Sequence, residues 1–121
     1  LCWTNIHFEM PTDKGILLKD ILEDGFTDRE KSYCLDANYF RGGNLKWYFE
    51  KHRRQLIFSD PVSTKDWRKL TVTECERLQT VPEGYTSMGS DGKKISNTQR
   101  YKMLGNGFTV DVIASILNGI K

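Results

Sequence analysis

The segment of residues 39–54 carries a dense mixture of positive charges and aromatic rings. Its basic side chains are opposed by a single acid, Glu50. Cations of this kind bind phosphate groups, while aromatic rings pack beneath loops or stack on bases. A run of charge is more often a solvated face, so both interpretations stand at this point. The candidate contacts to nucleic acid are Arg41, Gly42, Gly43, Asn44, Lys46, Lys51, Arg53 and Arg54.

A second candidate site is the tripeptide Gly105-Asn106-Gly107 near the end of the chain. Glycines allow a backbone to approach a ligand closely, and asparagine offers both a hydrogen-bond donor and an acceptor. The same tripeptide is typical of a turn between two helices, because asparagine and glycine tolerate left-handed backbone geometry. Taken alone, these residues favour the turn.

Metal and redox chemistry find little support in the sequence. The cysteines Cys2, Cys34 and Cys75 are widely spaced, and only His7 and His52 could join them, so we predict no metal site. Three unpaired thiols are typical of a reducing compartment. No apolar run approaches the roughly 20 residues needed to span a bilayer. The net charge of +2 by itself favours no class of partner.

The clearest element that could position these residues is a helix that begins after Thr71. Thr71 and Glu74 have the spacing of a capping box, and Leu70 and Cys75 occupy the flanking hydrophobic staple positions. We expect this helix to run to about residue 79, where Val81-Pro82 ends it.

The remaining elements are predicted to be short. Ser96 and Gln99 form a second capping box, so we expect a helix through residues 101–103 that the Gly105–Gly107 tripeptide interrupts. Asn44 is a candidate N-cap for a helix over 45–54. We further expect strands over 1–6, 32–37 and 55–59, a helix over 16–22, and a loop over 60–67.

The last predicted helix, over 109–118, is apolar around most of its circumference. Only Asp111 and Ser115 are polar within its central turns. Such a helix needs burial on several sides, and the rest of the chain offers no long hydrophobic strands to enclose it. Either it contributes to a core that other residues supply, which we favour, or it lies at the centre of a small domain.

Two stretches resemble the C-terminal motifs of the DNA (cytosine-5)-methyltransferases of bacteria and phages. Residues 68–85 resemble the ninth family motif, with an Arg-x-Leu-Thr start, a Glu-Cys-x-Arg helix and a closing proline. Residues 99–113 resemble the tenth motif, whose centre is Tyr-Lys-x-x-Gly-Asn. The two stretches follow each other in the family's order, and the pair is far more specific than either alone.

The resemblance implies a division of the chain into three parts. Residues 1–19 correspond to the end of a catalytic-domain strand and a connector, 20–67 to the variable target recognition region, and 68–121 to the ninth- and tenth-motif helices. Position in the recognition region favours the DNA interpretation of residues 39–54, with 41–44 as a flexible loop tip that enters a groove. A lesser basic group comprises Lys93, Lys94, Arg100 and Lys102.

The resemblance also assigns roles to the two motifs. The tenth motif lies beside S-adenosylmethionine in the family, which implies cofactor contacts by Asn106, Gly107 and Phe108. The ninth motif mainly organises the recognition region, which implies that its arginines brace carbonyls and carboxylates. The residues with this structural role are Arg68, Thr71, Glu74 and Arg77.

The family's catalytic apparatus is not found in this sequence. Its nucleophilic cysteine follows a proline, whereas Cys2, Cys34 and Cys75 do not, and the Gly-rich cofactor loop is absent. We therefore assign no catalytic residue and expect S-adenosylmethionine to bind only together with a large catalytic domain. Cys75 is expected to pack as a small apolar residue.

These observations predict an α+β chain: a small irregular recognition domain with short strands, followed by helices that pack on an absent α/β catalytic domain. The expected partners are double-stranded DNA and that domain, whether it belongs to the same chain or to a large subunit, in bacterial cytoplasm and without a membrane. In isolation, the exposed last helix should favour a homodimer or a swapped dimer. The alternative is a stand-alone module that binds DNA or protein without catalysis.

Overall fold

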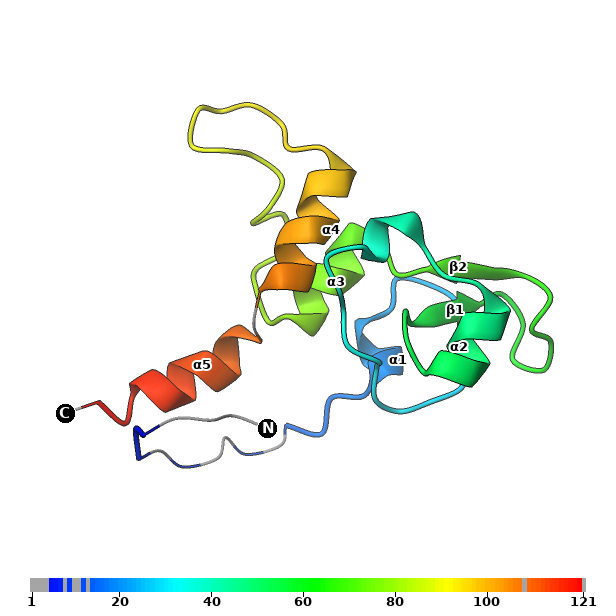
Figure 1. Cartoon of the computed structure of the whole chain (residues 1–121), viewed down its shortest axis with the longest axis horizontal. Helices are drawn as coiled ribbons and strands as arrows, with labels where there is room; N and C mark the ends of the chain where they lie inside the picture. The colour runs from blue at the N-terminus through cyan, green and yellow to red at the C-terminus, as the bar shows by residue number, and fades with distance from the viewer. Residues whose placement is uncertain (1–4, 8, 10–11, 13, 108, 121) are drawn as a thin grey trace.

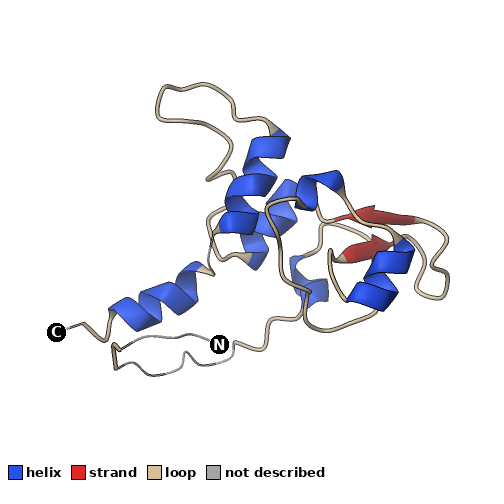
Figure 2. Ribbon diagram, in the orientation of Figure 1, coloured by secondary structure: helices blue, strands red, loops and turns tan. Residues whose placement is uncertain are grey.

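This α+β chain combines short helices with a small antiparallel sheet. The computed structural model describes residues 5–7, 9, 12, 14–107 and 109–120. Figure 1 shows the order of the elements and Figure 2 their types. In chain order they are α1 (Leu18–Ile21), the 3₁₀ helix η1 (Tyr39–Arg41), α2 (Leu45–Lys51), β1 (Leu56–Phe58), β2 (Trp67–Lys69), α3 (Val72–Leu78), α4 (Asn97–Asn106) and α5 (Val110–Leu117).

The sheet consists of β1 and β2, with Ile57 opposite Arg68 in an antiparallel register. Phe26 extends it by a single bridge to Phe58. The predicted strand over 55–59 is therefore confirmed. The predicted loop over 60–67 is wrong at its end, because Trp67 begins β2. This strand has two basic residues in three and shows no alternation in the sequence, so pairing with the buried β1 defines it.

The strand predicted over 32–37 is wrong. This segment is extended, but its backbone pairs with no strand among the described residues. The amide of Tyr33 instead donates to the side-chain oxygen of Gln55 at 3.1 Å. The chain then turns at Asp36, whose carbonyl accepts from the amide of Tyr39 at 3.0 Å to begin η1.

Helix α2 confirms the predicted cap but is shorter than expected. The side chain of Asn44 accepts a hydrogen bond from the amide of Trp47 at 2.8 Å. The helix ends at Lys51 because His52 adopts left-handed geometry with φ of 52°, and Arg54 does so again with φ of 62°. Non-glycine residues seldom adopt this conformation, and no sequence pattern indicated it.

The capping box of α3 is confirmed in both directions. The Thr71 hydroxyl accepts from the amide of Glu74 at 3.2 Å, and the Glu74 carboxylate accepts from the amide of Thr71 at 2.8 Å. The staple residues Leu70 and Cys75 are fully buried in one core cluster. The helix ends at Leu78, with Gln79 as its C-cap.

Helix α4 begins at the predicted cap but continues further than expected. The amide of Gln99 donates to the Ser96 hydroxyl at 3.3 Å. Gly105 and Asn106 are helical, so the predicted interruption at Gly105 is wrong and the helix ends before Gly107. Gly105 faces neighbouring backbone: a Cβ placed there would lie 2.6 Å from the amide nitrogen of Ala37 and closer still to the Asp36 carbonyl.

Two hydrophobic clusters hold the described residues together. The larger joins α1, η1, β1, α3 and α4, and the smaller packs Tyr48 of α2 on Leu56 and Phe58 of β1. The helix predicted over 16–22 is confirmed in its centre and supplies Leu18 and Ile21 to the larger cluster. Within the described part of the chain, no helix is long and apolar enough to cross a membrane.

Helix α5 contributes no residue to either cluster. Figure 1 shows that it extends away from the other helices towards the C-terminus. The predicted helix over 109–118 is confirmed, with Thr109 as N-cap and Asn118 as C-cap. Of its residues only Ile116 is buried, while Val110 and Leu117 are 45% and 54% exposed. A helix with this composition is therefore left largely uncovered by the chain that carries it.

Candidate functional site

Arg68 is the centre of a network that joins the sheet, α3 and the segment after α1. Its guanidinium donates to both carboxylate oxygens of Glu74 at 2.9 and 2.8 Å, and to the carboxylate and carbonyl of Asp24 at 2.6 and 2.8 Å. The amide of Glu23 adds a 2.8 Å hydrogen bond to Glu74. Burial alone would raise the pKa of the Glu74 carboxyl, but these donors together lower it.

Two further arginines fix the loops around α3. Arg77 donates to the Ile21 carbonyl at 2.8 Å and to the exposed Glu83 carboxylate at 2.6 Å. Arg100 of α4 donates to the fully buried Glu76 at 2.8 Å. Glu76 also accepts hydrogen bonds from the amides of Gly84 and Thr86, so one buried carboxylate holds the loop between α3 and α4. Its role was not predicted from the sequence.

The segment 41–44 is tied to the body of the chain. Gly42 has φ of 70° and ψ of −168°, a conformation open to glycine. Its carbonyl accepts from Arg54 at 3.0 Å, and a Cβ on Gly43 would lie 3.3 Å from the Cβ of Arg54. Both glycines are half-buried. The Arg54 side chain packs against this turn and supports it through the hydrogen bond to Gly42.

The cations of this region separate into two groups. Arg41, Lys46, Lys51 and Arg53 are exposed. Arg54 is only 9% exposed, and its guanidinium lies 5.5 Å from the Trp47 ring. Its buried Nε atom has no hydrogen-bond partner, although the Asp36 carboxylate lies 3.5 Å away. Arg54 therefore supports the turn from inside, and we leave it out of the surface available to a ligand.

A hydrogen-bond network around the Tyr48 hydroxyl stabilises the smaller hydrophobic cluster, to which α2 contributes Tyr48. The hydroxyl of Tyr48 donates to Asp28 and accepts from Arg29 and from Gln55, both at 3.0 Å. The Arg29 guanidinium also lies 3.8 Å from the centre of the Tyr33 ring. Burial, followed by the Asp28 hydrogen bond, raises the pKa of Tyr48 to about 12, so this hydroxyl stays protonated at neutral pH. The network orients α2 and its exposed cations.

Gln79 holds the connection between α4 and α5. Its side-chain amide donates to the carbonyl of Leu104 at 2.7 Å, and its side-chain oxygen accepts from the Thr109 hydroxyl at 3.2 Å. Its backbone carbonyl accepts from the amide of Val110 at 3.0 Å. One residue at the end of α3 thus satisfies groups on both sides of Gly107. This role was not predictable from the sequence beyond the position of Gln79 at a helix end.

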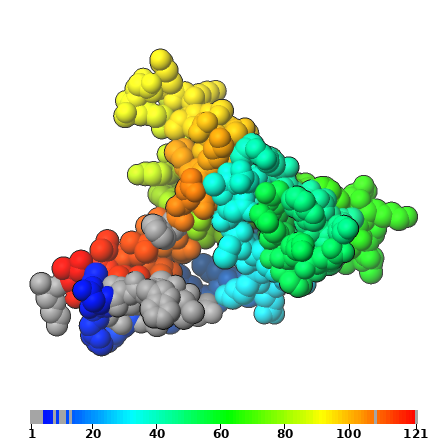
Figure 3. All heavy atoms as spheres, viewed as in Figure 1, coloured from blue at the N-terminus to red at the C-terminus, as the bar shows by residue number. Residues whose placement is uncertain are grey.

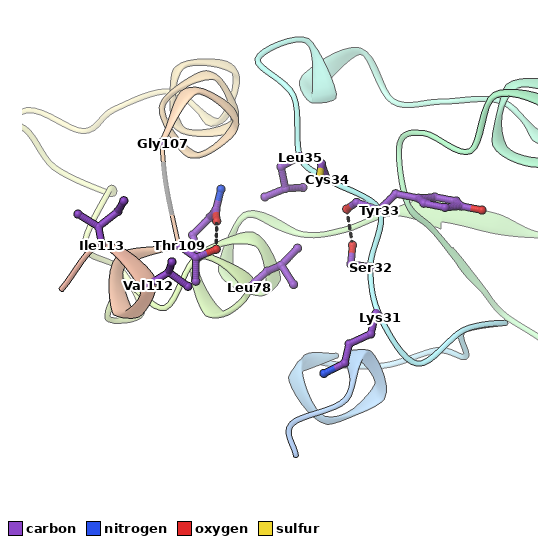
Figure 4. A pocket seen from close by; sticks show the side chains of 11 residues that line it. Lys31, Ser32, Tyr33, Cys34, Leu35, Leu78, Gly107, Thr109, Val112 and Ile113 are labelled. Atoms are coloured by element: carbon purple, nitrogen blue, oxygen red, sulfur yellow. Dashed lines mark hydrogen bonds between the residues drawn. The ribbon is translucent and has the colours of Figure 1, made fainter. Parts of the chain in front are cut away.

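A mainly apolar pocket of about 580 Å³ opens beside this connection, and Figure 4 shows its lining. Gly107, Thr109, Val112 and Ile113 form one side, and residues 31–35 face them across the opening. Leu78 and Gln79 lie at the end of α3 between them. Figure 3 shows the surface hollowed between α5 and the cyan segment. The uncovered helix therefore borders an open, apolar hollow.

The sequence of residues 5–121 matches the family model of the C-5 cytosine-specific DNA methylases. The chain belongs to this family. The chain is also 37% identical, over 131 aligned residues, to the type II methyltransferase M2.ScrFI of Lactococcus lactis subsp. cremoris. That match covers 93% of this chain and 36% of the relative, so the chain spans about a third of the relative's length.

The end of α4 presents polar groups at the surface of the chain. Asn106 is exposed at the last turn of α4, and its side chain has no hydrogen-bond partner among the described residues. It can both donate and accept, and Gly107 beside it presents no side chain. These features fit one side of a polar ligand. Phe108, the third predicted contact, lies outside the described residues.

The two cysteines that the structure describes differ in exposure: Cys34 is exposed and Cys75 is buried. Cys75 is fully buried, and burial raises the pKa of its thiol to about 12, so it stays protonated at neutral pH. Its packing in the core agrees with the expectation from the sequence. No group of histidine, cysteine, aspartate or glutamate among these residues could hold a metal ion.

Proposed function

We propose that this chain is the part of a DNA (cytosine-5)-methyltransferase that recognises the target DNA and completes the S-adenosylmethionine pocket. A separate catalytic domain would supply the cysteine nucleophile and the Gly-rich cofactor loop. The observation that carries the proposal is α5, which follows Asn106 and Gly107 closely and keeps its apolar residues Val110 and Leu117 exposed. The match to only 36% of its relative supports the same division of labour.

The exposed apolar surface of α5 gives the catalytic domain a place to pack. Val110 and Leu117 are exposed, and Val112 and Ile113 line the open pocket next to Gly107. Covering such residues removes apolar surface from water at about 25 cal/mol per Å². Packing there would bring the catalytic domain against the end of α4, where Asn106 would hold one edge of S-adenosylmethionine. The cofactor supplies the methyl group.

The DNA side of the proposal rests on the four exposed cations around α2. Arg41, Lys46 and Lys51 form no ion pair with a described carboxylate, and Arg53 has only a 3.5 Å contact with Asp36. Exposed cations of this kind neutralise phosphates and release counterions. The braced turn at Gly42 and the hydrogen-bond network of Tyr48 support the backbone that carries these cations.

Reconstitution tests the proposed function. The chain is mixed with a separately expressed methylase domain that carries the Pro-Cys motif and the Gly-rich loop, and transfer of labelled methyl groups to DNA is measured. We expect neither part to methylate DNA alone and the mixture to do so. Asn106→Ala should raise the KM for S-adenosylmethionine about tenfold, because one hydrogen-bonded edge is lost. Met103→Ala, an exposed position on the same helix, is the control. Full activity of the catalytic part alone would refute the proposal.

A salt titration tests the DNA surface separately. The double variant Lys46→Gln/Lys51→Gln should make the log–log salt slope of DNA affinity shallower by roughly 1.8, since each lost phosphate contact removes about 0.9. The control variant Lys14→Gln/Lys19→Gln changes net charge equally at exposed lysines outside residues 39–54 and outside the lesser basic group. We expect the control to keep the original slope. An equal loss in both variants would mean that net charge alone attracts the DNA.

A further inference from the structure

The ring of Phe40 lies at a junction where η1 packs against α4. The guanidinium of Arg41 is 5.5 Å from the centre of this ring, and the ammonium group of Lys102 is 5.2 Å from it. The two cations are far apart in the sequence and belong to different parts of the chain. Figure 3 shows the cyan atoms around residue 40 adjoining the orange atoms of α4.

A third cation completes the junction from the sheet. The ammonium group of Lys69, at the end of β2, donates to the Phe40 carbonyl at 2.7 Å. It also lies 4.6 Å from the centre of the Tyr101 ring, the residue before Lys102. Lys69 therefore fixes the position of Phe40, around which Arg41 and Lys102 gather. We call Arg41, Lys69 and Lys102 the junction cations.

Two of the junction cations, Arg41 and Lys102, are not neutralised by a described carboxylate. Among the described residues, neither Arg41 nor Lys102 forms an ion pair. Asp36, which adjoins both η1 and α4, lies 3.5 Å from Arg53 and from Arg54. Arg100 on the same helix differs from Lys102, because its charge is paired with buried Glu76 at 2.8 Å. Like charges gathered without a counterion repel one another and attract an anion.

We propose that Arg41 and Lys102 together hold the DNA phosphate backbone across the junction between the recognition region and α4. This inference rests on the proposed function and adds a contact from the tenth-motif helix. Arg41 is exposed, while Lys102 and Phe40 are half-buried. Two accessible cations from different parts of the chain suit an extended polyanion better than a small ion. The recognition region would then read the DNA while α4 holds its backbone.

The test measures DNA affinity against salt for a 20-base-pair duplex, with Lys102→Gln, Arg41→Gln and the parent chain. Each substitution should make the log–log slope shallower by about 0.9 and weaken binding on the order of threefold at moderate salt. Lys102→Arg should restore the parent slope, since it keeps the charge. Lys19→Gln, at an exposed lysine on α1, should leave the slope unchanged. Thermal unfolding of each variant reports whether folding is intact.

The outcomes separate this inference from the proposed function. If the parent chain binds DNA and Lys102→Gln keeps its slope, the junction contact is refuted while the recognition role stands. If the parent chain does not bind the duplex at all, both are refuted. If Lys102→Gln weakens binding of an acidic peptide as strongly as it weakens binding of DNA, the surface takes acidic protein and the phosphate assignment is wrong.

Discussion

Replacing Arg68 by methionine is expected to destabilise the chain by about 3–5 kcal/mol at neutral pH. Arg68 is the cation paired with Glu74, whose side chain is fully buried and accepts two hydrogen bonds from the guanidinium. Removing one partner of a buried pair leaves an uncompensated charge in the interior. The loss is measured as the change in free energy of unfolding by chemical denaturation. Because α3 supports the sheet through Arg68, DNA affinity should fall as well.

The pH dependence identifies the cause of that loss. In the parent chain the pKa of Glu74 lies below its ordinary value of 4.5, so its stabilising contribution is present above that pH and is lost as the pH falls through the lowered value. In Arg68→Met the burial of Glu74 instead raises its pKa, and the deficit is greatest at neutral pH. The difference between the two proteins should therefore narrow as the pH falls towards 4.

Two further variants serve as controls for the Arg68 substitution. Arg77→Met removes an arginine whose carboxylate partner, Glu83, is exposed, so no buried charge is left behind and the loss should be much smaller. Arg68→Met/Glu74→Gln removes both charges of the buried pair but keeps a side-chain oxygen that can accept from the amides of Thr71 and Glu23, so it should recover part of the stability. If the double variant is no more stable than Arg68→Met, the buried carboxylate is not the source of the effect.

Replacing Gly105 by alanine is expected to cost about 3 kcal/mol or more, although alanine is the better helix former. Gly105 lies inside α4, where alanine would ordinarily gain about 1 kcal/mol. The added Cβ would lie 2.6 Å from the Ala37 nitrogen and nearer still to the Asp36 carbonyl, so backbone must move. Overpacking against backbone outweighs the gain in helix propensity. The junction between η1 and α4 should loosen with it.

The matched control is Gly107→Ala, two residues further on. Its φ of −82° suits any residue, and the nearest atom to an added Cβ is the Met103 carbonyl at 3.1 Å. Thermal unfolding should show a clear loss for Gly105→Ala and a small change for Gly107→Ala. If Gly105→Ala is as stable as the parent chain, α4 does not pack on residues 36–37 in solution.

Local signals in the sequence predicted several elements because their causes lie within one helical turn. The Thr71–Glu74 capping box, the Asn44 cap and the Ser96 cap each depend on residues three positions apart, and all three hydrogen bonds are present. Elements that depend on distant partners were predicted poorly. Strand β2 exists through its pairing with β1, and the segment 32–37 stays unpaired because Gln55 occupies the Tyr33 amide.

The candidate site divides in the same way. Residue type alone identified the cations of residues 39–54, but burial removed Arg54 from the surface and made it a brace for Gly42. The small residues of the tenth motif were associated with close approach to a ligand, yet Gly105 approaches the chain's own backbone. The sequence placed Lys102 only in a minor basic group. The structure brings it close to Phe40, because η1 packs against α4.

The sequence by itself determined the family, the places where helices begin and the apolar character of the last helix, since each is a property of neighbouring residues or of residue type. Only the tertiary structure decided which charges are buried, which cations meet at Phe40 and which glycine contacts backbone. Those properties depend on the relative positions of segments that are far apart in the sequence, and chain packing sets these positions. The exposed apolar residues of α5 depend on both the sequence and the structure. The sequence shows that the helix is mainly apolar, and the fold shows that part of it stays exposed.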